Sequence, residues 1–451
     1  MIRSHRVKVM DNRGPMRRAH DLLVSGGDAW CWAVDRSNRI FREGLPPANG
    51  ASEMWADLKA HGPFGDLTTD SAQDVTRSWA TAWFEVAKRR KRGEAASYPT
   101  HKHYRMPVTW RKGRFSLSPP APGRRSRVTL TTRRGVPNLT LKLSHFHPYD
   151  PEQVRSVRLI EEAGDLYLDV TAWVGVEQAQ VDPEKVGGAD PGIIHPWAVS
   201  SGEDALLISG RAIRAEEALH LSDTRGRQKR ASRCRQPVRT RGGKPRQEGS
   251  RRQRKYARAQ REREARSRRK VRQELNYAAN EVRDFLVSTG TGTLAIGNPS
   301  GVEKKNSGRV QNRRTGRWMQ APAAAVVTWR CEEAGVHSEK VNERGTSSTC
   351  PLCGSPATKR GRKLTCRNPL CDASHHRDIA GSQNISTRLG ATPTEITSVM
   401  HRRIGQPKRR DRRRQLWDLY RTQSTEVLPV SGPPGSDPGS RSPRRGLAES
   451  H

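Results

Sequence analysis

The sequence predicts a multidomain chain of the mixed α/β class with an inserted zinc ribbon, and three observations lead to this prediction. The hydrophobic pattern is mostly helical over residues 16–92 and changes to short alternating runs over residues 98–181. Strands and helices then alternate as far as residue 345. Two closely spaced cysteine pairs follow, at the spacing of a zinc ribbon.

The composition points to a polyanion as the main partner. The chain of 451 residues carries a net charge of +37 and has a pI of about 11.0, and nucleic acid is the first candidate. A basic protein of a membrane surface is the alternative, but the sequence contains neither a long apolar span nor a lipidation motif, so no membrane partner is expected. Hydrophobic residues make up only 33%, which predicts tails or solvent-exposed helices.

The last helix before residue 95 has the clearest helical pattern. Its apolar residues share one face, Ser71 can cap its start, and Gly93 can end it. Lys88, Arg89 and Arg90 stand in its last turn, where the helix dipole favours cations. They are also candidates for contacts with nucleic-acid phosphates.

The runs that follow predict a small antiparallel sheet or barrel. Proline and glycine separate them, and Ala163-Gly164-Asp165 is predicted to form a hairpin turn between the last two. The runs are residues 114–117, 128–131, 139–143, 157–160 and 166–173.

A candidate metal-binding acid follows the sheet. Residues 186–190 predict a strand that ends at Asp190, and a Pro191-Gly192 turn leads to a second strand at residues 193–199. A sheet fixes the position of an acid at its strand end, which suits a metal ligand. An Asp-Pro-Gly turn is common, however, so Asp190 needs partners to form a site.

Residues 224–270 are extremely basic and form most of a basic helical segment, residues 224–286. Gly242 and Gly243 predict a loop in its first half, and a helix is expected from about Gln247, with an apolar face in its later part. A run of charges is usually a solvated face, but this density, with few acids, favours contacts with a nucleic-acid backbone. The candidate contact residues are Arg251, Arg252, Arg254, Lys255 and Arg258.

The remaining elements bring further acids to the ends of strands and helices. A buried strand is predicted at residues 293–296, a helix at 323–334, and a strand at 335–342 that reaches Glu343. Asp378 lies in a later helical run. From about residue 391 the chain loses its pattern and is predicted to be a disordered, basic tail.

The two cysteine pairs predict one structural Zn²⁺ ion. Cys350 with Cys353 and Cys366 with Cys371 can each hold the metal from a tight knuckle, and four thiolates close its coordination sphere. The alternative is two disulfides. The chain has no secretory signal and its three other cysteines are scattered, so we expect a reducing compartment instead.

The separated acids and the polyanionic partner together indicate one reaction. Two or three carboxylates that converge in a fold bind Mg²⁺ or Mn²⁺. Two such ions activate a water molecule and stabilise the leaving oxygen of a phosphodiester. The sequence therefore predicts metal-dependent hydrolysis of nucleic acid.

Three motifs resemble the transposon-encoded TnpB family and the related small type V CRISPR effectors. They are residues 188–193 (GADPGI), residues 346–354 (TSSTCPLCG), and Asp378 with Asn384-Ile385, within a resemblance that covers roughly residues 95–390. It implies an RNase H-like RuvC nuclease domain, split by the basic helix and the zinc ribbon, after an N-terminal β-barrel with a helical insertion. It also implies a guide RNA that finds double-stranded DNA beside a short flanking motif.

By this resemblance Asp190 is the first catalytic acid and Asp378 the third, but the second is missing from its usual place. The family has a Glu after the middle strand, whereas this chain has Gly297-Asn298. Either the site has lost a ligand or another acid replaces it. Glu343 is the first candidate, since some relatives resemble this arrangement, and Glu303 is the second. We expect Asp190, Glu343 and Asp378 to hold two Mg²⁺ or Mn²⁺ ions.

The resemblance also implies a division of the chain. Residues 1–15 and 95–180 form a wedge-like barrel; 16–94, a helical recognition insertion; 181–345, the RuvC-like domain with the basic segment 224–286; 346–374, the zinc ribbon that binds target nucleic acid; 375–390, the final RuvC segment; and 391–451, the tail.

The expected function is RNA-guided DNA endonuclease activity in a bacterial cytoplasm, in association with the nucleoid. One alternative is a guide-directed DNA-binding protein with weak or no cleavage, a transcriptional roadblock, which the missing acid motivates. Another is a guide-free zinc-ribbon DNA-binding protein associated with a transposase. The guide can come from a CRISPR array or from a transposon end, and the chain can act as a monomer or a dimer.

Overall fold

The computed structural model describes residues 1–44, 48–101, 105–121, 123–238, 246–298, 308, 312 and 320–403, and the statements below concern these residues. Some features of the sequence lie outside them. They are Glu303, the glycine pair Gly242-Gly243, and residues 404–451 of the predicted tail.

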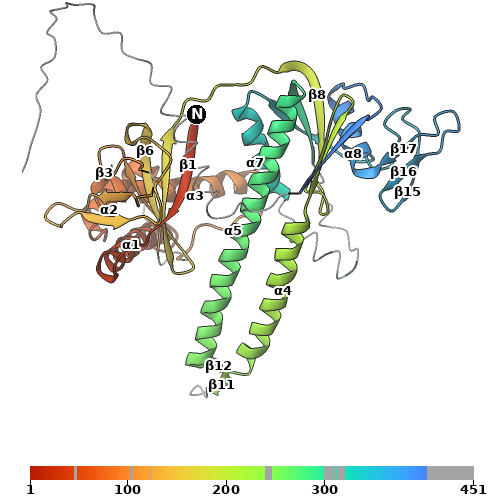
Figure 1. Ribbon diagram of the computed structural model, residues 1–451. Coiled ribbons are helices and arrows are strands. Elements are labelled where there is room, and N and C mark those ends of the chain that lie inside the picture. Colours follow the sequence, from red (N-terminus) through yellow and green to blue (C-terminus); the bar gives the residue numbers. More distant parts are fainter. Residues whose placement is uncertain are drawn as a thin grey trace, which may run out of the picture.

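The N-terminal lobe contains two antiparallel sheets (Figure 1). The strands are Ile2–Lys8 (β1), Val108–Arg111 (β2), Phe115–Leu117 (β3), Arg127–Leu130 (β4), Leu139–Lys142 (β5), Val154–Glu162 (β6) and Asp165–Trp173 (β7). One sheet has the order β1-β7-β6-β2, and the other has the order β3-β4-β5. A bridge between Val9 and Leu143 joins them, so the predicted antiparallel unit is confirmed.

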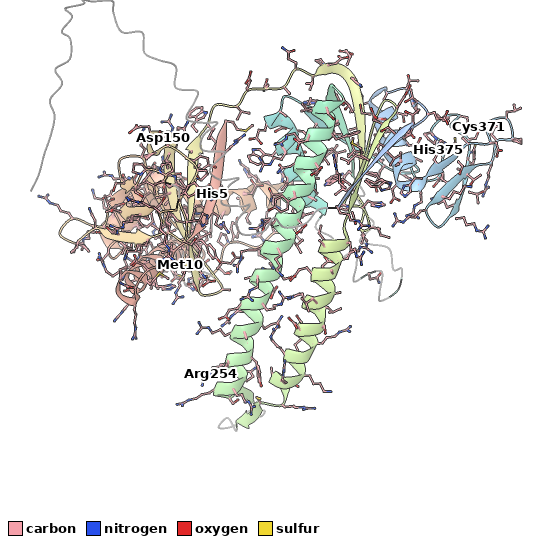
Figure 2. All side chains as sticks on the ribbon, viewed as in Figure 1. His5, Met10, Asp150, Arg254, Cys371 and His375 are labelled. Carbon is pink, nitrogen blue, oxygen red and sulfur yellow. The ribbon has the colours of Figure 1, made fainter. Side chains whose placement is uncertain are left out.

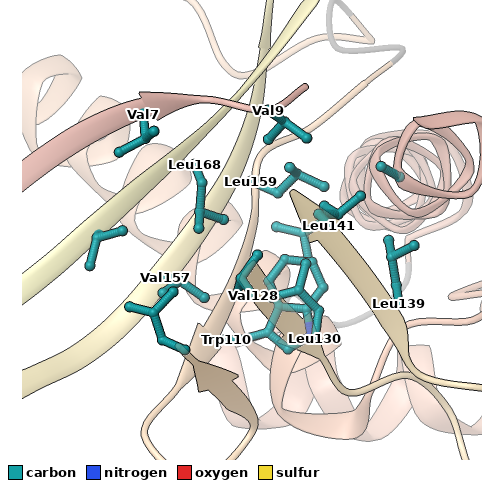
Figure 3. Close-up of a cluster of buried hydrophobic side chains, with 14 of the residues drawn as sticks. Val7, Val9, Trp110, Val128, Leu130, Leu139, Leu141, Val157, Leu159 and Leu168 are labelled. Atoms are coloured by element: carbon teal, nitrogen blue, oxygen red, sulfur yellow. The ribbon is translucent and has the colours of Figure 1, made fainter. Parts of the chain in front are cut away.

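The two sheets share one hydrophobic core (Figure 3). Val7 and Leu168, which pair across β1 and β7, face Val128 and Leu141 of the second sheet. The exposed and buried residues of β5 alternate, as expected for strands with one solvent-facing side. Trp110 lies within this core, where its indole N–H donates to the carbonyl of Thr131 at 2.8 Å.

The predicted hairpin turn joins β6 to β7. Ala163 and Gly164 have φ of 57° and 91°, and a two-residue hairpin with positive φ at both positions matches the twist of its strands. The sequence analysis missed β2, although its buried residues Val108 and Trp110 alternate with more exposed ones.

Three helices pack beside the first sheet: α1 (Arg13–Glu43), α2 (Ala51–His61) and α3 (Thr69–Lys91). The predicted apolar face of α3 is buried, and Trp79 stacks on Trp83 with ring centroids 5.8 Å apart. The predicted cap is wrong by one turn. Thr68 is the N-cap, and its side chain accepts the backbone N–H of Ser71. Threonine in extended conformation is one of the residues favoured at the N-cap.

The C-terminal lobe is built on a six-stranded mixed sheet of order β14-β13-β8-β9-β10-β18. The strands are Asp182–Asp190 (β8), Trp197–Ser201 (β9), Asp204–Ser209 (β10), Thr291–Asn298 (β13), His337–Asn342 (β14) and Ser398–Arg403 (β18). β8, β13 and β14 are parallel, and β9 returns antiparallel to β8. The antiparallel return predicted after Asp190 is therefore confirmed, but its second strand begins at Trp197 and not at residue 193.

Helices cover both faces of this sheet (Figure 1). Val199 and its neighbours pack against α5 and α7, whereas Ala198 packs with Ile379 of α8 on the opposite face. Successive strand residues point to opposite faces, so one strand serves both layers. These helices are α5 (Arg251–Ser288), α7 (Gln320–Glu333) and α8 (Arg377–Ser386).

A helical arm projects from this lobe (Figure 1). It consists of α4 (Arg211–Ser232) and the first half of α5, joined by a short hairpin of β11 (Arg235–Val238) and β12 (Arg246–Gly249). The sequence reading missed α4, because this helix buries no residue and has no apolar stripe. Ion pairs hold it instead: Arg263 of α5 binds Glu216 and Asp223, at 2.9 and 2.8 Å.

Part of the predicted tail is ordered. β18 pairs in parallel with β10 and completes the sheet. Five of its six side chains are exposed, so the strand is held by backbone hydrogen bonds and leaves no alternating pattern in the sequence. Among the described residues, no helix has both the length and the apolar character needed to cross a bilayer.

His147 makes the stability of the N-terminal lobe depend on pH. The imidazole is fully buried, its Nε2 lies 3.1 Å from the carbonyl oxygen of Ser118, and its Nδ1 has no hydrogen-bond partner among the described residues. Burial lowers the pKa of His147 from 6.5 to about 4. The unfolded chain therefore takes up the proton first, and stability that is present above pH 6.5 is lost as the pH falls towards 4.

We expect His147→Gln to reduce this pH dependence. Between pH 7 and pH 4.5 the wild type should lose about 2 kcal/mol more unfolding free energy than the variant, because one pKa unit corresponds to about 1.4 kcal/mol. Denaturant unfolding at both pH values measures the difference. His337→Gln, at an exposed histidine, is the control. An identical pH dependence in wild type and His147→Gln would contradict the assignment.

Candidate active site and metal centres

Two predicted acids lie at one edge of the C-terminal sheet. Asp190 is the last residue of β8, and Glu343 follows the last residue of β14. β13 lies between these strands and is parallel to both, with Ile296 opposite Ala189 and Gly297 opposite Val341. The carboxyl ends of parallel strands meet at the same edge, which is where open α/β sheets place their sites.

The carboxylate of Glu343 occupies the space beside Gly297. A Cβ atom on Gly297 would lie 2.7 Å from Glu343 Oε2, 2.8 Å from Ile385 Cδ1 and 3.2 Å from Pro191 Cδ. Glu343 Oε2 is buried and has no hydrogen-bond partner among the described residues. Glu343, which follows the neighbouring strand β14, thus places its carboxylate where the side chain of an acid at Gly297 would lie.

Close packing of α8 against β8 brings Asp378 to the same edge. A Cβ on Gly188 would lie 1.9 Å from the carbonyl oxygen of Ser382, and a Cβ on Gly381 would lie 2.6 Å from Asp190 Oδ2. Only residues without a side chain permit this approach. Asp378 stands in the first turn of α8, where an acid is favoured by the helix dipole.

The acids influence one another electrostatically. Burial, followed by the negative charges of Glu343 and Asp378, raises the pKa of Asp190 well above its ordinary range. Burial also raises the pKa of Glu343 to about 7. Carboxyl groups gathered in a poorly solvated place resist ionisation unless a cation neutralises them. The donor set, all oxygen, and the unpartnered Glu343 Oε2 therefore fit Mg²⁺ or Mn²⁺.

Asp378 is engaged by cationic and imidazole groups. Its Oδ2 lies 2.9 Å from His195 Nδ1 and 3.0 Å from a guanidinium nitrogen of Arg362, and its Oδ1 lies 3.3 Å from Arg377 Nε. Burial alone would raise its pKa, but the bond from His195 and the charge of Arg377 lower the pKa of Asp378 to about 2.

The sequence analysis missed the two histidines beside Asp378. His195, His376 and Asp378 bring one ligand atom each within 4.8 Å of one another, whereas the three predicted acids are not among the described groups that meet this limit. The wider spread of the acids is compatible with two ions about 3.5–4 Å apart. His195 follows Asp190 in the hairpin turn and His376 precedes α8, so nearness to the two acids in sequence was the available signal.

The four predicted cysteines converge as a metal site. Cys350 and Cys371 have their Sγ atoms 3.8 Å apart, and those of Cys353 and Cys366 are 3.4 Å apart. Tetrahedral Zn²⁺ with Zn–S of about 2.3 Å separates its sulfurs by about 3.8 Å, whereas a disulfide requires about 2.05 Å. All four thiols lie within 4.8 Å of one another, so the set fits zinc and the disulfide alternative is wrong.

The ribbon is a three-stranded antiparallel sheet whose last strand leads directly into α8. Its strands are Ala357–Arg360 (β15), Lys363–Cys366 (β16) and Ser374–His376 (β17). Asn384, a residue of the predicted motif, donates through Nδ2 to the carbonyls of Thr346 and Thr349 at 2.6 and 2.9 Å. It thereby ties α8 to the start of the ribbon.

Comparisons with known proteins bear on the same part of the chain. Residues 324–385, which include the cysteines and both Glu343 and Asp378, match the family model described as Cas12f1-like, TNB domain. The resemblance to the TnpB family and the small type V effectors is confirmed. A comparison with curated protein sequences finds no match.

Solved structures share the fold. The chain is similar to Cas12f1 in a complex with sgRNA and target DNA, with 15% identity, a TM-score of 0.56, and coverage of 82% of this chain and 81% of that one. It is also similar to the mini-RNA-guided endonuclease CRISPR-Cas_phi3, with 10% identity, a TM-score of 0.51, and coverage of 87% and 93%. The chain thus shares its multidomain α/β fold with these two proteins.

The predicted phosphate-binding cations lie on α3 and on the arm, which are not the elements that carry the acids. Lys88, Arg89 and Arg90 are exposed at the end of α3, where Arg89 binds Glu94 at 2.8 Å. The basic residues of α5 line the outer part of the arm, and Figure 2 places Arg254 near its tip. With a rise of about 1.5 Å per residue, this tip stands well away from the sheet edge.

We expect Gly297→Ala to displace the carboxylate of Glu343. The added methyl group would overpack the site at a cost of about 1–3 kcal/mol. Removing the Glu343 side chain relieves part of the clash, so Gly297→Ala/Glu343→Ala should be more stable than the sum of the single changes by about 1 kcal/mol. Equilibrium unfolding of the four proteins measures this coupling. Gly14→Ala, where a Cβ meets nothing within 4 Å, is the control, and strict additivity would refute the contact.

The ribbon should bind one zinc ion per chain. Cys353→Ser or Cys366→Ser should remove it, because a closed structural site needs all four thiolates. Elemental analysis of purified protein measures the metal, and a chelator should lower the melting temperature of the wild type only. Cys234→Ser, on the arm, should keep its zinc. A zinc-free wild type with unchanged stability would argue against the site.

Proposed function

We propose that this protein is an RNA-guided DNA endonuclease that hydrolyses phosphodiester bonds at a RuvC-type site formed by Asp190, Glu343 and Asp378. The observation that carries the proposal is the position of the Glu343 carboxylate beside Gly297. Glu343 thereby supplies a second acid at the sheet edge, in place of the glutamate expected at the end of β13. The proposal is further supported by the likeness in fold to Cas12f1 and CRISPR-Cas_phi3.

Each acid has a distinct part in this proposal. Asp190 is fixed at the end of β8, and its carboxylate interacts electrostatically with those of both Glu343 and Asp378. Glu343 supplies an oxygen from the far side of β13, and Asp378 supplies one from the start of α8. Two Mg²⁺ or Mn²⁺ ions, when bound, supply water activation and stabilisation of the leaving oxygen. Arg362 and Arg377 beside Asp378 can bind phosphate oxygens of the substrate.

The guide and target follow from the charge of the chain and from the family. We propose a guide RNA and a double-stranded DNA target as partners, with base pairing reading the target and the protein reading a short flanking motif. The exposed cations of α3 and of the arm would hold the nucleic-acid backbone. The domain assignments made from the sequence, with the ribbon binding target nucleic acid, belong to this proposal.

A second candidate is guide-directed DNA binding with weak or no cleavage. Asp378 favours it, because three groups occupy both of its oxygens. With a pKa of about 2, Asp378 is ionised, and its negative charge is already compensated by these groups. A metal ion would have to displace them. Binding without cleavage would make the protein a roadblock on its target.

Plasmid cleavage in Mg²⁺ distinguishes these functions. The protein is co-expressed with its flanking locus so that its guide is present. Wild type should cut a guided target, and Asp190→Ala and Glu343→Ala should each lose cleavage by at least about a hundredfold, since a metal ligand is removed. All three proteins should bind the target equally.

Glu339→Ala is the matched control, because Glu339 is an exposed acid on the same strand, β14. It should cut like the wild type. Full activity of Glu343→Ala would refute its role as the second acid. Guided binding by a wild type that never cuts would establish the second candidate.

A further inference from the structure

A basic pocket opens on the second sheet of the N-terminal lobe, away from the acids. It lies between the connection from β3 to β4 and the end of β5, and its volume is about 660 Å³. Its lining includes four cationic side chains and two hydroxyls, from Arg124, Arg125, Arg127, Lys142, Ser118 and Ser126.

The positive charge of this pocket is largely uncompensated. Within the described residues, no carboxylate forms an ion pair with Arg124, Arg125 or Arg127, and Lys142 is 4.0 Å from Asp11 Oδ1. Two other arginines of the same lobe are paired: Arg111 binds Asp74 at 2.8 Å and Arg114 binds Asp70 at 2.5 Å. The pocket therefore gathers four cationic side chains that have little compensating negative charge.

A buried hydroxyl in the lining lacks a partner. Ser126 is 2% exposed, and its Oγ forms no hydrogen bond within the described part of the chain. Its position is fixed, since its backbone carbonyl accepts the N–H of Leu143 at 2.9 Å. An unsatisfied buried hydroxyl is unfavourable, so a ligand group that enters the pocket would satisfy it.

We propose that this pocket binds the terminal phosphate of a nucleic-acid strand. Ser126 Oγ would donate to one phosphate oxygen, and the guanidinium groups would bind the others as charge-assisted donors. A terminal phosphate has free oxygens on several sides and can enter the pocket, whereas an internal phosphodiester is flanked by two sugars. That the strand is a guide RNA rests on the proposed function, but the affinity for a terminal phosphate does not.

Binding of short oligonucleotides to the full-length protein tests the proposal. One RNA sequence is prepared with a 5′-phosphate and with a 5′-hydroxyl, and a DNA of the same sequence likewise. Fluorescence anisotropy at fixed salt gives the four affinities. The phosphate should strengthen binding by about tenfold, as expected for one charged hydrogen-bonded group. The nucleic acid, RNA or DNA, whose affinity increases more on adding the 5′-phosphate is the one that supplies the terminal phosphate.

Two variants should abolish this gain. Arg125→Gln removes a guanidinium from the lining, and Ser126→Ala removes the buried hydroxyl without lowering the melting temperature, because no bond of the free protein is lost. Arg134→Gln, an exposed arginine outside the lining, weakens binding of all oligonucleotides through charge alone and should keep the gain.

Equal affinities for phosphate and hydroxyl ends would overturn the proposal. The proposal would also be overturned if Arg125→Gln and Arg134→Gln reduced the effect of the 5′-phosphate on affinity equally, because the phosphate would then be bound by the basic surface in general and not by this pocket. Neither outcome depends on DNA cleavage, so failure of the nuclease proposal leaves this test unaffected.

Discussion

The close approach of α8 to β8 is the constraint on which the C-terminal lobe depends. Gly188 and Gly381 leave no side chain between the two elements, so the helix lies almost on the strand. Asp378 is thereby carried to the edge that holds Asp190, and Asn384 at the other end of α8 binds the backbone of the ribbon. The packing of α8 on β8 therefore positions both Asp378 beside Asp190 and the ribbon with its four cysteines, although Asp190 and the ribbon are distant in the sequence.

The same edge is electrostatically divided. Asp190 and Glu343 are buried acids whose pKa values are raised, whereas Asp378 is held ionised among His195, Arg362 and Arg377. Arg362 comes from the turn between two strands of the ribbon. The ribbon thus contributes a positive charge beside Asp378 as well as carrying the four cysteines. A movement of the ribbon would therefore change the charge balance at Asp378.

Much of this arrangement was predictable from the sequence, and two of the missed elements share a physical cause. Asp190 at a strand end, the hairpin after it, the four cysteines and the apolar face of α3 are local patterns, and the structure has all of them. α4 and β18 were missed because ion pairs and backbone hydrogen bonds hold them, and neither leaves a hydrophobic period. The fit of Glu343 beside Gly297 was inferred from resemblance, since no local pattern reports a contact between neighbouring strands.

The arm has a consequence for how such chains can diverge. Every buried residue of α5 lies at or beyond Ala265, and α4 buries none, so the outer half of the arm makes no contribution to either hydrophobic core. Adding or deleting matched helical turns there would leave the sheet, the acids and the ribbon undisturbed. Arm length is thus a dimension in which the protein can change its reach while the C-terminal lobe stays under separate selection.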